Sequence, residues 1–206
     1  MSGSRSEICY ICQRPGAESD DHVVPQSWFQ KPFARPLLLL PAHHRCHGGH
    51  MSNCENYVRN LRALFACAGS VGEQIWNGPI AREYRRNAKL RNSLRGSLSE
   101  GRRRARAPGI AIEAQRFYPP LEKILKGLHC YHVGRLIPQN AQYNWTIINC
   151  AREEHFEILN LSTPGWTYPS VFESRYFISF ASASSVWWLR LFQQLSLRCY
   201  VRAAVP

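Results

Sequence analysis

Three short stretches near the amino terminus decide how this chain folds: Cys9-Tyr-Ile-Cys12, Asp21-His22-Val23-Val24-Pro25 and His43-His44-Arg45-Cys46-His47. Two cysteines separated by two residues form a turn whose sulfurs converge on one metal ion, and His43 with Cys46 repeats that spacing about thirty residues later. Zinc prefers thiolate and imidazole ligands in closed tetrahedra. The spacing therefore predicts one zinc ion held by Cys9, Cys12, His43 and Cys46.

Two alternatives to this ligand set stay open in the sequence. His44 follows His43 directly, so either imidazole is a candidate for the fourth ligand, although the two-residue gap to Cys46 favours His43. A redox-active pair of Cys9 and Cys12 is the competing interpretation of the first motif.

Taken together, Cys-x2-Cys, Asp-His-x-x-Pro and ligand-x2-Cys-His resemble the HNH endonucleases, whose ββα-metal fold here carries an added structural zinc. The chain is also similar to uncharacterised bacterial and phage HNH proteins beyond this motif. The similar positions are Leu40-Pro41-Ala42, Ile75-Trp76, Arg85-Arg86-Asn87, Lys123 to Leu128 and His132-Val133-Gly134. A ββα unit is too small to bury a sufficient apolar core, so the zinc ion is expected to replace part of that core.

The resemblance implies hydrolysis of DNA phosphodiester bonds and assigns roles to four residues. His22 is the expected general base, since a neutral imidazole is available near pH 7. Asp21 and His47 are expected to hold a catalytic divalent ion, Mg²⁺ or another, and His50, about one helical turn after His47, contacts the same ion or the phosphate.

The chain departs from the family pattern at identifiable positions. The middle Asn, which pins the loop between strand and helix, falls at Pro36, and a basic residue often found after Asp-His-x-x-Pro is Gln26. The family usually has Cys where this chain has His43. At the position after Cys46, where Asn is common, His47 restores the HNH form.

Positive charge is concentrated in the middle of the sequence. The formal net charge is +12, and residues 58–110 hold twelve basic and three acidic side chains, whereas residues 1–57 hold five of each. A polyanion is the expected partner, DNA in the first place, with RNA left open. The alternative is a solvated helical face. The predicted phosphate contacts are Arg82, Arg85, Arg86, Lys89, Arg102, Arg103, Arg104 and Arg106.

Hydrophobic periodicity predicts an α+β chain in three regions. Residues 1–57 form the zinc-stabilised ββα-metal (HNH) module, residues 58–135 a basic helical region and residues 136–206 an antiparallel β-rich region. Strands are expected over 20–24, 37–40, 171–180 and 195–202. Helices are expected over 55–67, over 73–99 with a new start at Pro79, and over 120–134. Residues 186–189 fit either a strand or a buried helix.

Cysteine usage and the termini bear on the compartment. The spacing of the remaining cysteines does not suggest disulfide pairs; they are Cys54, Cys67, Cys130, Cys150 and Cys199. The segment before Cys9 is short and polar, unlike a signal peptide, and no apolar run reaches the length of a membrane span. We therefore expect a soluble cytoplasmic protein, encoded by a bacterium or phage, that does not engage a membrane. A homodimer stays open.

Three functional hypotheses follow. The first is a metal-dependent DNA endonuclease of the HNH type. The second is a zinc-dependent nucleic-acid-binding protein that does not cleave, and the third is a subunit of a larger assembly that docks through its aromatic tail. Retention of Asp21, His22 and His47 together favours the endonuclease, because a binding protein needs none of them.

Overall fold

The computed structural model describes residues 7–29, 36–64, 76–92, 95–96, 112–148, 162–169, 171–179, 184–193 and 195–202. The chain divides into two compact units. One unit combines Met1–Gly48 with Glu122–Pro206, and the other is Gly49–Leu121. The three-region division of the sequence stays a prediction about domain boundaries.

The first unit begins with a two-stranded antiparallel sheet. Strand β1 (Ser19–His22) pairs with β2 (Leu39–Ala42), with Ser19 opposite Ala42 and His22 opposite Leu39. A short 3-10 turn, η1 (Gln26–Trp28), follows β1, and the four-residue helix α1 (His44–His47) follows β2. The predicted strand over 37–40 is wrong by two residues. The apolar run begins at Leu37, but β2 begins at Leu39. The amide of Leu38 donates to the hydroxyl of Tyr168 at 2.7 Å.

Helix α6 (Ala114–Val133) begins in one unit and ends in the other. The predicted start at Pro120 is wrong by six residues, since Pro119 and Pro120 lie inside the helix. A proline inside a helix removes one N–H donor and crowds the carbonyl four residues earlier, yet α6 continues through both prolines.

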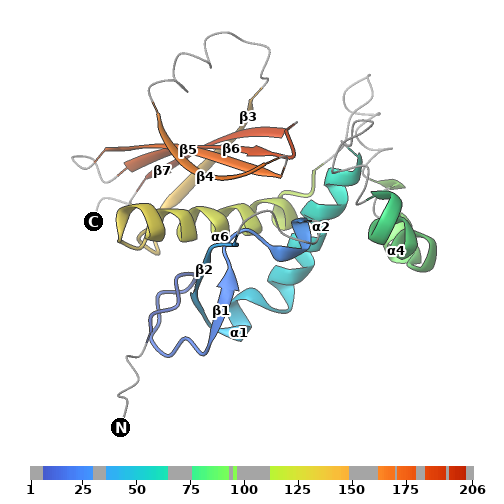
Figure 1. Ribbon diagram of the computed structural model, residues 1–206, viewed down its shortest axis with the longest axis horizontal. Helices are drawn as coiled ribbons and strands as arrows, with labels where there is room; N and C mark the ends of the chain where they lie inside the picture. Colours follow the sequence, from blue (N-terminus) through green and yellow to red (C-terminus); the bar gives the residue numbers. More distant parts are fainter. Residues whose placement is uncertain are drawn as a thin grey trace. The chain divides into compact units, whose positions relative to one another are not determined.

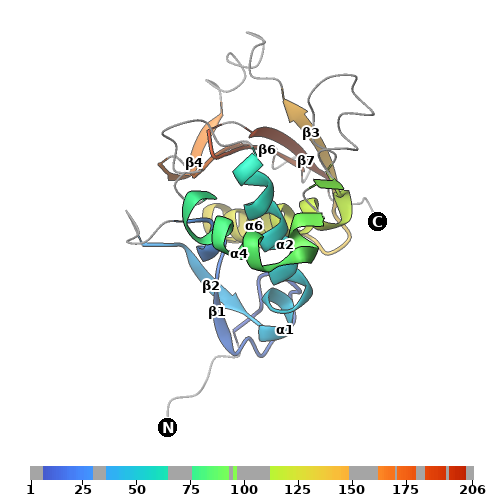
Figure 2. The same ribbon diagram turned by 90° about the vertical axis from the view of Figure 1, so that its right-hand side faces the viewer.

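The part of α6 from Glu122 onward lies between the two sheets of the first unit (Figures 1 and 2). At Gly127 it passes so close to the segment after β1 that a Cβ there would come within 2.5 Å of Val23 Cγ1. Glycine at this position therefore permits the close approach of the helix to the β1 side.

A five-stranded antiparallel sheet forms the rest of the first unit, in the order β3-β7-β6-β5-β4. The strands are β3 (Gln142–Ile148), β4 (Thr163–Tyr168), β5 (Phe172–Ser179), β6 (Ser184–Leu191) and β7 (Leu195–Arg202). The strands predicted over 171–180 and 195–202 are confirmed. Residues 186–189 belong to a strand, which decides the alternative left open by their periodicity.

Alternation along these strands separates two faces of the sheet. On β7, Leu197, Cys199 and Val201 are buried, whereas Tyr200 and Arg202 between and after them are exposed. Trp187 on β6 is fully buried and stacks on Tyr176 of β5 at 5.0 Å between ring centroids.

The second unit contains α2 (His50–Leu64), a π-helical turn over Trp76–Ile80 and α4 (Ala81–Arg86). Cys54, Tyr57, Val58 and Leu61 are buried on one face of α2, at helical spacing. The Tyr57 hydroxyl accepts a hydrogen bond from the Glu113 amide at 2.9 Å, and the Arg116 guanidinium lies 4.3 Å from the Tyr57 ring centroid.

The helix predicted to run on from Pro79 is interrupted. Asn87 adopts an extended conformation at the end of α4, and its side-chain oxygen accepts a hydrogen bond from the Leu90 amide at 3.1 Å. Asn87 therefore starts a new helical turn over residues 88–92 in the manner of a helix cap, which ends α4 at Arg86.

The mixed helix-and-strand class with an antiparallel sheet is confirmed. Among the residues described above, no helix is both long and apolar enough to cross a membrane.

Candidate metal and catalytic site

Four side chains from two separate turns converge at the amino-terminal end of the first unit. Donor atoms of Cys9, Cys12, His43 and Cys46 all lie within 4.8 Å of one another. The Nδ1 atom of His43 is 3.2 Å from Cys12 Sγ and 3.9 Å from Cys46 Sγ. In a tetrahedral zinc site the sulfur and nitrogen ligands are about 3.5 Å apart, given bond lengths of ~2.3 and ~2.0 Å. The four residues therefore fit a zinc ion.

Backbone turns bring each pair of ligands together. The Gln13 amide donates to the Cys9 carbonyl at 2.8 Å, and Gln13 itself has a φ of 62°. In the second pair the Cys46 amide donates to the His43 carbonyl at 2.8 Å. Each pair of ligands, Cys9 with Cys12 and His43 with Cys46, thus lies in one tight turn, and both side chains of the pair are directed at the same point.

The environment of His43 assigns its ligating nitrogen and decides between the two adjacent histidines. His43 is buried, and its Nε2 lies 3.1 Å from the Pro15 carbonyl oxygen, which can only accept a hydrogen bond. Nε2 therefore carries the proton and leaves Nδ1 with a lone pair directed at the thiols. Zinc-ligating histidines usually donate their other ring N–H to a carbonyl or carboxylate in this way. His44 is exposed and does not belong to the cluster.

The thiols favour a cation among them. Burial and the neighbouring Cys12 and Cys9 raise the pKa of Cys46 to about 12. Burial also opposes ionisation of Cys12, but hydrogen bonds from the Arg14 backbone and from Cys46 and Cys9 outweigh it and lower the pKa of that thiol. A divalent ion would offset the repulsion between several thiolates in this small volume.

A buried ion pair lies beside the Cys and His cluster. Asp21 is 8% exposed, and its Oδ2 atom is 2.8 Å from the ammonium of Lys123, which is 1% exposed. The Tyr10 hydroxyl donates to the same oxygen at 2.5 Å. Lys123 also donates to the main-chain carbonyl of His22 at 3.1 Å. One side chain of α6 therefore fixes both residues of the Asp-His pair.

The other oxygen of Asp21 faces His47. His47 Nδ1 is 3.9 Å from Asp21 Oδ1, which is too long for a hydrogen bond. His47 Nε2 lies 3.0 Å from the Ser19 hydroxyl oxygen. Because that hydroxyl donates to the Ala42 carbonyl at 2.8 Å, Nε2 is the donor to Ser19. A neutral His47 consequently directs the Nδ1 lone pair at a carboxylate oxygen.

His22 ends β1 and is half-buried. Its pKa is lowered, chiefly by burial; the negative charge of Asp21 raises it and the positive charge of Lys123 lowers it further. His22 is therefore neutral at pH 7, the protonation state that a general base requires.

A side chain of β4 anchors Pro36 and Leu38, which precede β2. The Tyr168 hydroxyl accepts from the Leu38 amide at 2.7 Å and donates to the Pro36 carbonyl at 3.4 Å. Tyr168 is buried on β4, so the five-stranded sheet holds the start of β2 in place.

Other predicted site residues fall in different parts of the chain. His50 begins α2 in the second unit, where its Nε2 is 3.5 Å from Cys54 Sγ. Arg82, Arg86 and Lys89 line a cavity of about 690 Å³ within that unit, and Arg85 is exposed on α4. Arg102, Arg103, Arg104 and Arg106 lie outside the described residues. The nucleic-acid role of these eight residues stays a prediction.

Lys123, Tyr10 and Ser19 are contributors that the sequence patterns did not identify. Lys123 is separated from Asp21 by about a hundred residues, and no local spacing rule connects them. Tyr10 lies between Cys9 and Cys12, where the motif leaves the residue unspecified. Ser19 precedes the strand expected over 20–24 and becomes the first residue of β1 in the structure.

Comparison with protein families, with curated proteins and with solved structures finds no match.

Substitution of Cys12 by Ser should remove the metal from the protein and unfold the amino-terminal part of the first unit. Zinc binding supplies folding free energy that a small module lacks, so the loss should affect structure as well as metal content. Elemental analysis of purified protein should show about one zinc per chain in the wild type and none in Cys12→Ser. Thermal unfolding should move to a lower temperature.

Cys130→Ser is the matched control, because Cys130 is half-buried on α6 and outside the cluster. It should retain the metal and most of the stability. Acidification should release the metal from the wild type, because protons compete for the thiolates and for His43 Nδ1. Metal-free wild-type protein, or a Cys9–Cys12 disulfide, would contradict the assignment.

Substitution of Lys123 by Ala should destabilise the first unit by about 3–5 kcal/mol, because the Asp21 carboxylate would stay buried without its cation. Lys126→Ala is the matched control on the same helix. Lys126 is half-buried and donates to the Ile11 carbonyl at 3.3 Å, so its loss should cost about 1 kcal/mol. Urea unfolding measures both, and the Asp21→Asn/Lys123→Met double variant should recover part of the loss. Equal effects at the two lysines would contradict the importance of the ion pair.

Proposed function

We propose that this protein is a metal-dependent endonuclease of the HNH type that hydrolyses DNA phosphodiester bonds. The observation that carries the proposal is the approach of His47 Nδ1 to Asp21 Oδ1, with His22 following Asp21 in β1. In this proposal the Cys and His cluster is structural, and Asp21 and His47 would hold the catalytic divalent ion.

The separation of the two ligand atoms supports this second site. Two donors that each lie ~2.1 Å from one Mg²⁺ ion can be at most ~4.2 Å apart, and the observed distance is 3.9 Å. The tautomer of His47 agrees with this role, since Ser19 holds Nε2 and leaves Nδ1 for the ion. The Asp21 carboxylate oxygen is also a type of ligand that a hard cation such as Mg²⁺ prefers.

The chain's own groups divide the reaction between them. His22 takes the proton of the attacking water, and its lowered pKa keeps it neutral for this step. Lys123 holds the His22 main chain and the Asp21 carboxylate, so that the base and the metal ligands keep a fixed relation. A divalent ion bound there would neutralise charge on the scissile phosphate and on the leaving oxygen.

A non-cleaving, zinc-dependent nucleic-acid-binding protein is the second candidate. The Lys123 ammonium 2.8 Å from Asp21 Oδ2 already compensates the carboxylate charge, which lowers the gain from binding a divalent ion. The activity of the two histidine variants below distinguishes the candidates.

Substitution of His22 by Ala should abolish Mg²⁺-dependent nicking of supercoiled plasmid, because loss of a general base typically lowers the rate by about a hundred- to ten-thousand-fold. Zinc content, thermal stability and DNA affinity should stay near wild-type values. His47→Ala should also be inactive, through loss of a metal ligand, and a higher Mg²⁺ or Mn²⁺ concentration should restore part of its activity. His22→Ala should not respond to added metal.

His44→Ala is the control, since it removes an exposed imidazole from the same four-residue helix as His47. It should cleave like the wild type. Equal nicking by wild type and His22→Ala would assign the activity to another site or to a contaminant, and the binding-protein candidate would then be preferred.

The pH dependence of cleavage should show the lowered pKa of His22. A general base works in its deprotonated form, so activity is lost as the pH falls through its pKa. Because burial lowers that pKa, the acid limb of kcat/KM should have its midpoint below the ordinary histidine value of about 6.5. A midpoint above that value would contradict the role of His22.

A further inference from the structure

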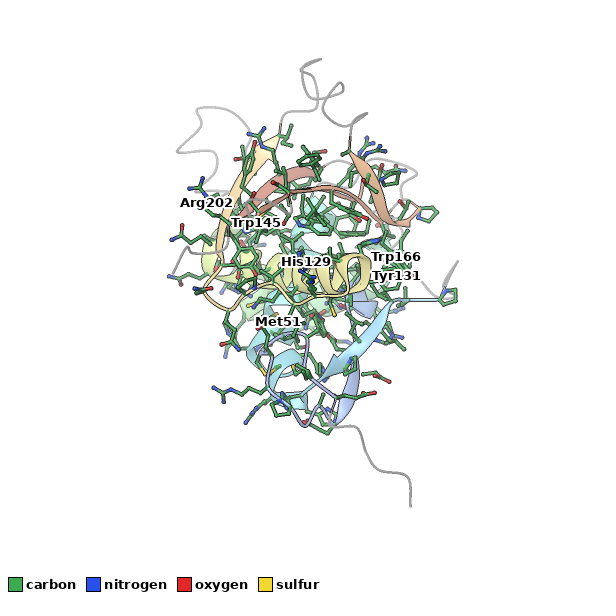
Figure 3. The ribbon with its side chains drawn as sticks, turned by 90° about the vertical axis from the view of Figure 1, so that its left-hand side faces the viewer. Met51, His129, Tyr131, Trp145, Trp166 and Arg202 are labelled. Carbon is green, nitrogen blue, oxygen red and sulfur yellow. The ribbon has the colours of Figure 1, made fainter. Side chains whose placement is uncertain are left out.

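Helix α6 covers one face of the five-stranded sheet. The His132 ring lies 4.9 Å from the Tyr176 ring, and the His129 ring lies 6.3 Å from that of Trp187. Tyr131 of the same helix meets Trp166 of β4 edge to face, with ring centroids 4.9 Å apart. Figure 3 labels these two residues beside each other. Because strand residues alternate between faces, the neighbours of Tyr176 and Trp187 along β5 and β6 lie on the opposite face, here called the outer face.

The strand register defines rows of side chains across the outer face. Trp188 of β6 lies between Arg175 of β5 and Arg198 of β7, directly opposite each. The next row places Phe177, Val186 and Tyr200 side by side on the same three strands. Aromatic and arginine side chains are therefore neighbours both along the strands and across them.

Two of these aromatic rings are open to solvent although they are large and apolar. Phe177 is 56% exposed and Tyr200 is 44% exposed, whereas Trp187 on the inner face is fully buried. The Arg198 guanidinium lies 5.1 Å from the Tyr200 ring centroid. Stacking surfaces and cationic groups thus occur together within a few ångströms.

The charge of the outer face has one dominant sign. Strands β5, β6 and β7 place four arginines on it, Arg175, Arg190, Arg198 and Arg202, and one acidic residue, Glu173, which is opposite Arg190. Arg190 and Arg202 are exposed. A solvated sheet face of no function would more often mix both charges and carry few exposed aromatic rings.

We propose that the outer face binds single-stranded nucleic acid. Unpaired bases have two free π-faces that stack on aromatic side chains, and the phosphates between them pair with arginines. A sheet presents such groups at strand spacing on an extended surface, whereas duplex bases stay stacked on one another. DNA and RNA share this chemistry, and the test below compares them. This site is formed by residues outside the metal centres and does not depend on cleavage.

The test measures binding of fluorescein-labelled oligo(dT) and oligo(U), each about 20 nucleotides, to full-length protein by fluorescence anisotropy without added divalent ion. Phe177→Leu and Tyr200→Leu keep an apolar side chain but remove the π-face. Each should weaken binding about fivefold or more, because one base–aromatic stack is worth ~1–3 kcal/mol. A protein or lipid partner that buried the same patch would tolerate leucine.

Arginine variants test the phosphate contacts separately. The Arg198→Gln/Arg202→Gln double variant should reduce the slope of log affinity against log salt concentration by about 1.4, since each single-strand phosphate contact contributes ~0.7. Wild-type protein should prefer the single strand over a duplex of the same length. The difference between oligo(dT) and oligo(U) reports whether a 2′-hydroxyl is recognised.

Matched controls lie in the same unit but off the outer face. Tyr131→Leu removes an aromatic ring that is 52% exposed on α6. Arg135→Gln removes an exposed charge just after the end of that helix. Both should bind like the wild type, and thermal unfolding checks that every variant is folded. Equal affinity for duplex and single strand, or equal losses in control and outer-face variants, would overturn the proposal. Failure of plasmid nicking would leave these results unaffected, because they require no catalysis.

Discussion

The buried contact between Lys123 and Asp21 connects the two ends of the first unit. A lysine that is 1% exposed needs a partner for its charge, and Asp21 supplies one at 2.8 Å, with the His22 carbonyl as a further acceptor. Helix α6 therefore cannot rotate or slide along β1 without leaving a charge unpaired. This requirement places the Asp-His pair, and with it the candidate catalytic centre.

The Cys and His cluster imposes a second, local constraint. It holds the turn after Cys9 against the turn after His43, and the backbone amide of His43 points at Cys9 Sγ from 3.5 Å. Helix α1 follows directly from this turn, so the cluster also sets the position of His47. The Lys123 ion pair positions Asp21, and the Cys and His cluster positions His47. The two residues come from different strand–turn segments and face each other because both contacts form.

The five-stranded sheet contributes to the amino-terminal module as well as forming a surface of its own. Tyr168 on β4 holds Pro36 and Leu38, just before β2, through hydrogen bonds to their main-chain atoms. One face of the sheet packs on α6, and the other carries arginines among exposed aromatic rings. The face proposed to bind single-stranded nucleic acid is therefore formed by other residues than the candidate metal centre.

The sequence by itself determined the spacing of the Cys and His residues in the cluster, the antiparallel strands with two-residue alternation and the concentration of basic residues, because these are local patterns. It did not determine which of the two adjacent histidines belongs to the cluster, where β2 begins or where α6 begins. Those outcomes depend on Pro15, Tyr168 and the tolerance of two prolines inside a helix, none of which leaves a periodic signal. The pairing of Asp21 with Lys123 and the shared outer face of the sheet were decided only by tertiary structure, because strand register and helix packing join residues that are far apart in the sequence.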